Sequence, residues 1–521
     1  MSSALGGSEL GRLPLSVCMI VKDEAQNLPM ALASVKDWVQ EMVVVDTGSS
    51  DGTQAIASGF GARVLEIAWQ QDFAQARNVA LDAARSEWIL CLDADEFLLS
   101  GAREVLAAAL RRPGLAQTVS IGLFAGVPEV LEGRVQGQCV SQFASLRLFR
   151  RDPRIRYRGR VHEDVSESLL EIGADDWPDS GLFVVDHGYG EAQARELKRA
   201  RNLQLLELAH AEQPDQLFVA YKLAITLPAS RQAQRHEVLM KALAQARSME
   251  PSVLRSQAFM PRLLAAAIQS CVQRGRLVEA VDISQPFAAL LGPLVAFSTG
   301  RAAARAGLWD QAVLQLQDFL DRGLGQQGGL ILLDLEASEA QACRWLAWSA
   351  RMRGELESAR AWLERAMASA PPAQRMGVGC EGVRLDLAQG RIERAAAYLD
   401  VLAPLAQDSS LARAELMLVS AEVSQAAGDV VGAMALARAA MAGLDADHEL
   451  VDAAAALSAM LEVQRLGAQE EMAESRVREL FDAVKGQRFD TLAVKWLLSR
   501  RLGVALELSV PQATLQLLEA A

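Results

Sequence analysis

Residues 15–53 have the sequence LSVCMIVKDEAQNLPMALASVKDWVQEMVVVDTGSSDGT, in which two apolar runs flank an amphipathic segment. The runs at 16–21 and 42–45 predict buried strands, and the segment at 25–39 predicts a helix. A strand, a helix and a second strand in this order indicate a right-handed crossover and parallel pairing. Polar, largely acidic residues follow each strand at once. The stretch therefore predicts an α/β fold with a ligand-binding edge.

The same alternation continues beyond this stretch. Helices and strands are predicted in turn at 54–59, 63–67, 73–85 and 88–92. Later apolar runs predict additional strands at 118–124, 142–149 and 182–185. We therefore expect the N-terminal part to be a Rossmann-like domain with a mainly parallel sheet.

From about residue 191 onward, helical segments rich in Ala, Leu, Glu and Arg replace the β-branched runs. Five times, a glycine is followed by an alanine five residues later: Gly275/Ala280, Gly307/Ala312, Gly354/Ala359, Gly390/Ala395 and Gly428/Ala433. The intervals between the glycines are 32, 47, 36 and 38 residues. Glycine can end a helix in the left-handed conformation, and alanine lets the next helix pack closely. This pattern resembles tetratricopeptide (TPR) repeats, which stack into an all-α array with a concave groove.

Four segments follow from these changes of pattern. We expect a flexible tail at residues 1–13, an α/β domain at 14–190, a connecting helix at 191–213 and TPR-like helical repeats at 214–521. The connecting helix is amphipathic and carries the basic stretch Lys198-Arg199-Ala200-Arg201. It is expected to pack on the segments before and after it.

Composition excludes several classes of protein. The 521 residues carry a formal net charge of −13, which argues against a nucleic-acid partner. The sequence has no run of about 18 apolar residues to span a membrane, and its first residues lack a signal-peptide pattern. Its six cysteines are scattered, without the spacing of a zinc site or the density of a disulfide scaffold. A reduced, cytoplasmic protein is expected.

Three acidic turns, at 22–24, 46–53 and 93–96, follow predicted strands at the edge where parallel strands end. Carboxylates gathered there repel one another unless a cation or hydrogen-bond donors balance them. Asp93 and Asp95 offer two carboxylates to one hard divalent cation, whose other positions water and phosphate oxygens fill. The same tripeptide, Asp-Ala-Asp, recurs at 445–447, where a solvated turn is expected. The buried strand upstream distinguishes the first copy.

Four blocks carry a resemblance to a known family: LSVCMIVKDEAQNL (15–28), VVVDTGSSDGT (43–53), FAQARNVALDAA (73–84) and WILCLDADE (88–96). Their order and spacing resemble the family 2 glycosyltransferases, which have the GT-A fold. Three later blocks resemble a subgroup with helical repeats, similar to enzymes that glycosylate cysteine or serine in bacteriocin peptides: LRLFRRDPRIRYRGRVHED (146–164), VVDHGY (184–189) and KRARNLQLLE (198–207). The resemblance spans roughly the first 210 residues.

This resemblance implies a nucleotide-sugar donor, expected to be a UDP-sugar, and a divalent cation, Mn²⁺ or Mg²⁺. It assigns the donor site to Glu24, Asp46, Asp51, Arg77 and Asp93, and the metal site to Asp93 and Asp95. Structural alternatives remain open for some of these. Arg77 is otherwise a surface arginine of a helix, and Asp46 and Asp51 are otherwise an Asx turn and a helix N-cap.

Family members of this fold usually invert the anomeric carbon, and such a transfer needs a base that takes the acceptor's proton. Glu163, next to His162, is the candidate, and both are taken as candidate catalytic residues. The surrounding arginines, from Arg150 to Arg160, offer positive charge for the leaving diphosphate, although most of them are expected to be solvated. His187 is a candidate metal ligand or phosphate contact, or else a structural hydrogen-bonding residue.

These features predict a metal-dependent, inverting glycosyltransferase whose protein or peptide acceptor is recruited by the TPR-like groove. Two alternatives remain open. The acceptor is instead a cell-surface glycan or a lipid-linked sugar, or the chain is a non-catalytic TPR scaffold with a degenerate sugar-nucleotide domain. The presence of all four blocks counts against the scaffold.

Overall fold

The computed structural model describes most of the chain: residues 11–124, 128–131, 134–137, 139–188, 192–287, 291–323, 337–407, 409–442, 448–466 and 474–484, together with residues 444, 491, 493–495 and 498. The Asp-Ala-Asp tripeptide at 445–447 and Tyr189 lie outside the described residues. Contacts divide the chain into two compact units that meet in sequence between Thr226 and Leu227. We describe each unit by itself.

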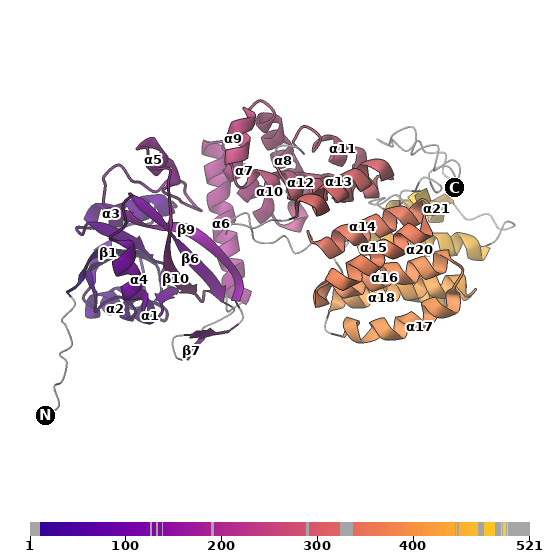
Figure 1. Ribbon diagram of the computed structural model, residues 1–521, viewed down its shortest axis with the longest axis horizontal. Coiled ribbons are helices and arrows are strands. Elements are labelled where there is room, and N and C mark those ends of the chain that lie inside the picture. The colour runs from indigo at the N-terminus through magenta and orange to yellow at the C-terminus, as the bar shows by residue number, and fades with distance from the viewer. Residues whose placement is uncertain are drawn as a thin grey trace. The chain divides into compact units, whose positions relative to one another are not determined.

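The first unit is an α/β domain (Figure 1). Its strands are β1 (Leu13–Val21), β2 (Val39–Asp46), β3 (Arg63–Glu66), β4 (Trp88–Cys91), β5 (Glu96–Leu98), β6 (Ala116–Phe124), β7 (Glu129–Leu131), β8 (Arg134–Gln136), β9 (Cys139–Arg150) and β10 (Asp179–Asp186). Its helices are α1 (Leu28–Ala33), α2 (Thr53–Gly59), α3 (Phe73–Ala83), α4 (Ala102–Ala109), α5 (Ser166–Glu171), α6 (Ala192–Glu212) and α7 (Leu217–Thr226).

The main sheet has eight strands in the order β3-β2-β1-β4-β9-β6-β10-β5, and β7 and β8 form a separate hairpin. The strands β3, β2, β1 and β4 are parallel neighbours, as the early alternation of strands and helices predicts. β9 pairs antiparallel with both β4 and β6, and β5 pairs antiparallel with β10. The sheet is therefore mixed. The chain returns from β6 to β9 past the β7–β8 hairpin rather than through a crossover helix, which produces antiparallel pairing.

The first helix is shorter than the sequence pattern suggests. The amphipathic segment predicts a helix over 25–39, whereas α1 covers only Leu28–Ala33. Pro29 lies in its first turn, where proline is tolerated because that position needs no N–H partner. Downstream, Val39 already pairs with Leu13 as the first residue of β2, so sheet pairing ends the helical segment early.

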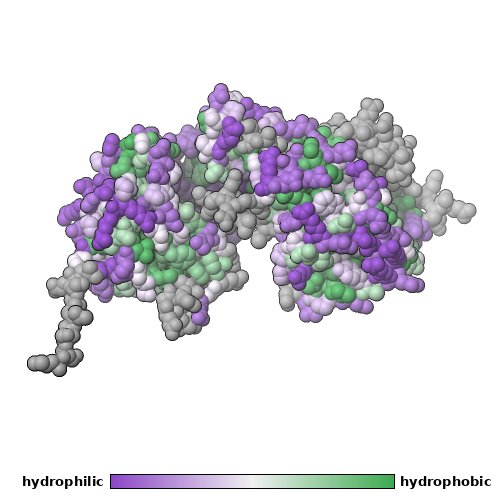
Figure 2. Space-filling view, viewed as in Figure 1, coloured by the Kyte–Doolittle hydropathy of each residue, from purple (hydrophilic) through white to green (hydrophobic). Residues whose placement is uncertain are grey.

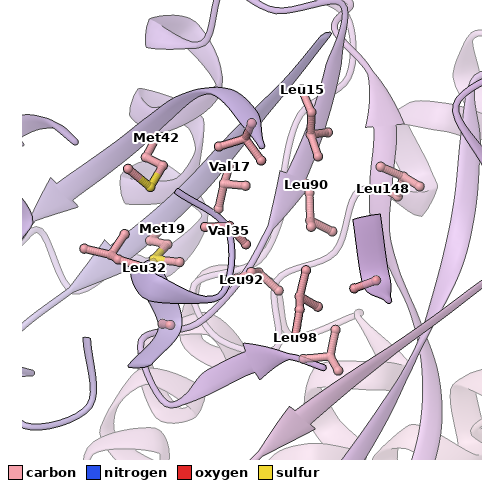
Figure 3. Packing of buried hydrophobic residues seen from close by; sticks show 14 of the residues in the cluster. Leu15, Val17, Met19, Leu32, Val35, Met42, Leu90, Leu92, Leu98 and Leu148 are labelled. Carbon is pink, nitrogen blue, oxygen red and sulfur yellow. The ribbon is translucent and has the colours of Figure 1, made fainter. Parts of the chain in front are cut away.

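Both faces of the parallel part of the sheet are buried, which explains its unbroken apolar runs. On one face, Val17 and Met19 of β1 and Leu90 of β4 pack with residues of α1 and α4, and each of the three is at most 1% exposed (Figure 3). On the other face, Cys18 and Ile89 pack against α3 and α5. Helix α3 is thereby fixed against the sheet.

The second unit is built from helices. The described elements are η1 (Ala229–Arg231), α8 (Gln232–Ala246), α9 (Pro251–Ser256), α10 (Met260–Gln273), α11 (Leu277–Asp282), α12 (Pro293–Arg305), α13 (Trp309–Arg322), α14 (Glu339–Met352), α15 (Leu356–Ser369), α16 (Pro372–Ala388), α17 (Ile392–Leu402), η2 (Ala403–Ala406), α18 (Ser410–Ala426), α19 (Val430–Met441), α20 (Glu449–Leu466) and α21 (Glu474–Ala483). Successive helices pack on one another as TPR-like hairpins.

The repeated glycine and alanine have the roles that the sequence predicts. One of the five glycines lies between each of the helix pairs α10/α11, α12/α13, α14/α15, α16/α17 and α18/α19. Their φ angles lie between 70° and 88°, the left-handed region in which a Cβ is disfavoured. Each of the five alanines is 0% exposed. The motif therefore supplies a tight turn and a close helix contact in every pair.

Within the described residues, no helix combines the length and the apolar character needed to cross a bilayer. The faces visible in Figure 2 are mostly hydrophilic, with hydrophobic residues in smaller areas between them.

Candidate active site

Three loops converge at one edge of the sheet because β2, β1 and β4 are adjacent. Val21, the last residue of β1, lies beside Asp46, the last residue of β2. The backbone continues this pairing, since Thr47 N donates to Val21 O (3.0 Å) and Leu92 N donates to Cys18 O (3.1 Å). The acidic turns after β1, β2 and β4 therefore leave the sheet side by side, as expected from the sequence.

Asp46 organises the turn that follows it. Its Oδ1 accepts hydrogen bonds from Gly48 N (2.8 Å), Ser49 N (2.8 Å) and Gln54 Nε2 (3.0 Å). Burial opposes ionisation of Asp46, but the hydrogen bonds from Ser49, Gly48 and Gln54 outweigh it and lower its pKa. Its Oδ2 is buried and has no hydrogen-bond partner among the described residues. Asp46 therefore has the Asx-turn role, and its Oδ2 remains available to accept a hydrogen bond.

Asp51 joins the first two loops. Its Oδ1 accepts hydrogen bonds from Thr53 Oγ1 (2.5 Å) and Thr53 N (3.1 Å), and its Oδ2 accepts one from Ala25 N (2.9 Å). Hydrogen bonds from Thr53 and then from Ala25 lower the pKa of Asp51. Glu24, next to Ala25, accepts a hydrogen bond from Asn27 Nδ2 (2.8 Å), and burial raises its pKa. Asp51 thus has a structural role that is compatible with a ribose contact.

Arg77 is not a surface arginine but a buried one, 7% exposed, in the middle of α3. Its Nη2 contacts Asp93 Oδ1 (2.7 Å) and its Nε contacts Glu163 Oε1 (2.6 Å). The guanidinium also stacks over the Tyr157 ring, 5.4 Å from the centroid. One arginine therefore joins the turn after β4 to the loop that carries Glu163.

A second arginine, Arg147 of β9, contacts the same carboxylate. Its Nη2 lies 3.1 Å from Asp93 Oδ2 and 3.4 Å from Glu96 Oε1. Although burial opposes it, the attraction of Arg77 and then Arg147 holds the pKa of Asp93 far below its usual range. Burial, with the charge of Asp93, raises the pKa of Glu96 to about 8 against the opposing effect of Arg147. These surroundings favour the ionised form of Asp93 and the protonated form of Glu96.

Asp95 faces a different cation. Lys198 Nζ of α6 lies 2.9 Å from Asp95 Oδ2 and 3.5 Å from Gly188 O. Gly188 leaves room for this pair, because a Cβ there would lie 1.9 Å from Asp95 Oδ2 and 3.0 Å from Lys198 Nζ. Asp186, two residues before Gly188, accepts a hydrogen bond from Gly188 N (2.9 Å). Burial, and then the charge of Asp95, raises the pKa of Asp186 to about 6.

His187 lies beside Asp95, since His187 N donates to Asp95 O (3.1 Å). The side chain is buried, and within the described part of the chain its Nε2 has no hydrogen-bond partner. Burial lowers the pKa of His187, so the imidazole is neutral at pH 7. A neutral imidazole with an unpartnered buried nitrogen, next to a carboxylate, is a donor set that a divalent cation such as Mn²⁺ accepts. In chemical type these residues fit the expected metal, but in the described part of the chain the ligand atoms of His187, Asp93 and Asp95 do not all lie within 4.8 Å of one another.

Glu163 and His162 lie on the same loop but have different surroundings. Glu163 is the counter-ion of Arg77, whose Nε contacts its Oε1. His162 has a φ of 57° and packs edge-on against Phe218 of α7, with ring centroids 6.4 Å apart. Partial burial and the nearby Lys222 lower the pKa of His162. The structure therefore brings Glu163, rather than His162, to the acidic edge.

The other arginines of the basic run do not gather around Glu163. Five of the six form ion pairs with other carboxylates: Arg150 with Glu87, Arg154 with Asp152, Arg156 with Asp82, Arg158 with Glu171 and Arg160 with Glu212. The last pair borders a groove of 660 Å³ between α3, residues 157–161 and the end of α6. Because its charged groups are already paired, we assign this groove no part in donor binding.

A cluster in the second unit brings three candidate metal ligands close together. Among the described residues, His236, Cys271 and Glu279 of the second unit have ligand atoms within 4.8 Å of one another. The Arg276 guanidinium fills this cluster, with Nη1 3.4 Å from His236 Nε2 and 3.2 Å from Glu279 Oε2. We therefore assign it a structural role. At the acidic edge, by contrast, an ion would need phosphate oxygens or water to complete its coordination.

The structure thus gathers most of the residues selected from sequence. Arg77, Asp93 and Glu163 form one connected cluster, and Asp95 and His187 lie immediately next to it. Asp46, Asp51 and Glu24 form the neighbouring loop network. From the sequence, Glu96 was included in the acidic turn at 93–96 without a role, and no site role was given to three other charged residues: Arg147, Asp186 and Lys198. The available signals were a charge within the apolar strand β9, the block at 184–189 and the basic stretch in α6.

Comparison with known proteins identifies the domain that holds this edge. Residues 16–161 match the glycosyl transferase family 2 model. This segment is a family 2 glycosyl transferase domain. It contains the loop network and the Arg77 cluster except Glu163, whereas Asp186, His187 and Lys198 lie beyond its end.

Two curated relatives match parts of this chain. A TPR repeat-containing protein of Synechococcus elongatus is 39% identical over 218 residues, which cover 40% of this chain and 51% of the relative. The SPbeta prophage-derived glycosyltransferase SunS of Bacillus subtilis is 27% identical over 168 residues, 32% of this chain and 38% of the relative. The chain therefore spans about half the length of these relatives, or less.

Solved structures give weaker similarities. S. aureus TarS has a TM-score of 0.28 and 15% identity, covering 56% of this chain and 55% of that one. A tetratricopeptide repeat protein from Parabacteroides merdae has a TM-score of 0.35 and 14% identity, covering 50% of this chain and 93% of that one.

Proposed function

We propose that this chain is a metal-dependent, inverting glycosyltransferase that moves a sugar from a nucleotide-sugar, expected to be a UDP-sugar, to a protein or peptide acceptor. One observation carries the metal-dependent donor site. Asp93 and Asp95, which lie within the family 2 domain, and the unpartnered nitrogen of His187, which lies beyond its end, occur at the same edge of the sheet. A cytoplasmic location stays a prediction from the sequence.

Arg77 and Arg147 hold Asp93 in one orientation from two sides. Because both guanidinium groups are largely buried, the turn that carries Asp93 and Asp95 is fixed before a donor arrives, so less ordering entropy is lost on binding. The loop network of Asp46, Asp51 and Glu24 lies beside it and is assigned to the base and ribose of the donor. The buried, unpartnered Oδ2 of Asp46 supports this assignment.

Asp95 and His187, with Asp93, would hold the Mn²⁺ or Mg²⁺ ion. When bound, such an ion supplies Lewis-acid stabilisation of the departing diphosphate. The chain itself contributes positive charge to the same edge, from Lys198 of α6.

Glu163 is the proposed base. It lies at the mouth of the Arg77 cluster, and its side chain is 10% exposed. Arg77 holds this carboxylate in place through its Oε1. Glu163→Gln is expected to keep nucleotide binding and to lose transfer.

The acceptor is proposed to be recruited in part by the TPR-like repeats of the second unit, because grooves of stacked helices bind peptides. The glycan-acceptor alternative differs in one measurement. Transfer to a peptide acceptor requires no lipid-linked or polymeric sugar, whereas transfer that occurs only with such sugars would replace the peptide proposal.

Release of free nucleotide from a panel of nucleotide-sugars, in the presence of Mn²⁺, tests the proposed activity. Asp95→Ala is expected to abolish release and Mn²⁺-dependent nucleotide binding. The control is Asp82→Ala, which removes an exposed carboxylate of the same unit that pairs only with Arg156 among the described side chains. Wild-type release by Asp95→Ala contradicts the proposal. A wild-type chain that binds no nucleotide-sugar supports the scaffold alternative.

A further inference from the structure

Lys198 occupies the place at Asp95 where a cation is needed. Its ammonium lies 2.9 Å from Asp95 Oδ2 and also within reach of Gly188 O. The absent Cβ of Gly188 allows this approach. Asp186 and Glu24 also interact electrostatically with Lys198, so one ammonium faces several carboxylates at the acidic edge.

Helix α6, which carries Lys198, also brings a second positive charge close to the acidic edge. Arg201 lies one turn after Lys198, and its guanidinium stacks over the Phe73 ring, 4.9 Å from the centroid. It interacts electrostatically with Glu163, Glu24 and Asp95. By contrast, Arg199 is directed elsewhere, donating from Nε and Nη2 to Thr226 O (3.3 Å each).

We propose that Lys198 is an exchangeable counter-ion: it neutralises Asp95 before the divalent cation binds, and it moves to the donor's diphosphate once the cation occupies Asp95. This inference rests on the proposed function and adds a coupling between metal loading and donor binding.

The physical basis is competition for one carboxylate. An ammonium and a divalent cation cannot both contact Asp95 without strong mutual repulsion. Lys198 is free to move, because its side chain is 44% exposed and has a flexible four-carbon stem. Its ammonium carries three donors, which suit the oxygens of a nucleoside diphosphate. Displacement therefore places a positive charge next to the group that will leave.

The coupling predicts two effects of opposite sign. In Lys198→Gln, Mn²⁺ binding without nucleotide is expected to tighten about fivefold, because a competing charge is removed. In the same variant, UDP binding at saturating Mn²⁺ is expected to weaken about tenfold, because a charge-assisted hydrogen bond to phosphate is lost. General damage to the site would weaken both.

The experiment uses the full chain. The electron paramagnetic resonance signal of free Mn²⁺ reports metal binding without nucleotide, and calorimetry with UDP at saturating Mn²⁺ reports donor-site binding. Arg199→Gln is the matched control, since it removes the same charge from the adjacent residue and is expected to change neither affinity. Lys198→Arg keeps the charge and is expected to keep Mn²⁺ affinity near the wild-type value. Equal thermal melting of the variants checks folding.

Opposite shifts in Lys198→Gln, absent from Arg199→Gln, support the exchange. Unchanged or weaker Mn²⁺ binding in Lys198→Gln overturns it. If wild-type chain still releases nucleotide in that case, the proposed function stands and only the exchange fails. If wild-type chain binds neither UDP nor Mn²⁺, both fail.

Discussion

At the scale of single residues, the site contains more carboxyl groups than guanidinium groups. Two guanidinium groups, those of Arg77 and Arg147, contact three carboxyl groups, those of Asp93, Glu163 and Glu96. Two cations balance two anions, so the third carboxyl group is the surplus one. Glu96 is the most buried of the three, with its side chain 2% exposed, and burial raises its pKa, which favours its protonated form.

Glu96→Gln is therefore expected to fold, with a melting temperature close to that of wild type near pH 4.5 and above that of wild type at pH 7. In wild type, the pKa of Glu96 is about 8 in the folded state and near 4.5 when unfolded. Its contribution to stability is then present below pH 4.5 and is lost as the pH rises towards 8. The variant lacks this loss, so its stability relative to wild type should increase between pH 5 and pH 8.

Melting curves across this pH range test the prediction, and Arg77→Gln provides the contrast. Removing Arg77 leaves Asp93 and Glu163 without their main partner, at an expected cost of about 3–5 kcal/mol. A pH-independent difference between Glu96→Gln and wild type would show that Glu96 is ionised in the folded chain.

Which side chains reach this edge was only partly predictable. Asp93 and Asp95 could be placed from sequence because the strand that carries them fixes where it ends. Arg147 and Lys198 are 54 and 103 residues away from their partners in the chain, and no local pattern links them. Their role follows from the strand order and from the packing of α6, which determine what a side chain faces.

At the scale of elements, the hairpin glycines make a clean test of backbone strain. Gly390 has a φ of 71°, and a Cβ there would meet nothing within 4 Å. Gly390→Ala is thus expected to cost about 1–2 kcal/mol from the left-handed conformation alone. Urea unfolding followed by circular dichroism measures the change.

The matched control is Gly382 in α16, where a Cβ would make only an ordinary contact, 3.7 Å from Tyr398. Gly382→Ala is expected to stabilise the unit by up to about 1 kcal/mol, because alanine favours the helix and loses less entropy on folding. Destabilisation of similar size in both variants would assign the cost to something other than the turn.

Local patterns predicted the elements better than their directions. The apolar runs at 16–21, 42–45 and 88–92 each became a strand, and the five hairpin turns lie where the glycines are. The antiparallel direction of β9 was not predictable, because an apolar run has the same composition whichever way it pairs. The short α1 shows the same limit, since pairing of β2 with β1 overrides a helical pattern.

At the scale of the whole molecule, the two compact units are expected to unfold separately. Calorimetry of the full chain should resolve two transitions. Mn²⁺ with UDP should raise the melting temperature of only one of them. The corresponding stabilisation is about 2.7 kcal/mol when UDP is at 100 times its dissociation constant. Gly390→Ala should lower only the other. A single transition that responds to both would contradict this division.

The five helix pairs that contain a glycine turn have a further consequence for the evolution of the second unit. Each carries its own glycine turn and its own buried alanine, so insertion or deletion of one pair leaves the turns of its neighbours unchanged. Such an array can lengthen, shorten or exchange modules during evolution while the charged cluster of the first unit is inherited without alteration. Under the proposed recruitment of the acceptor by these repeats, its recognition is expected to diversify faster than the chemistry of the first unit.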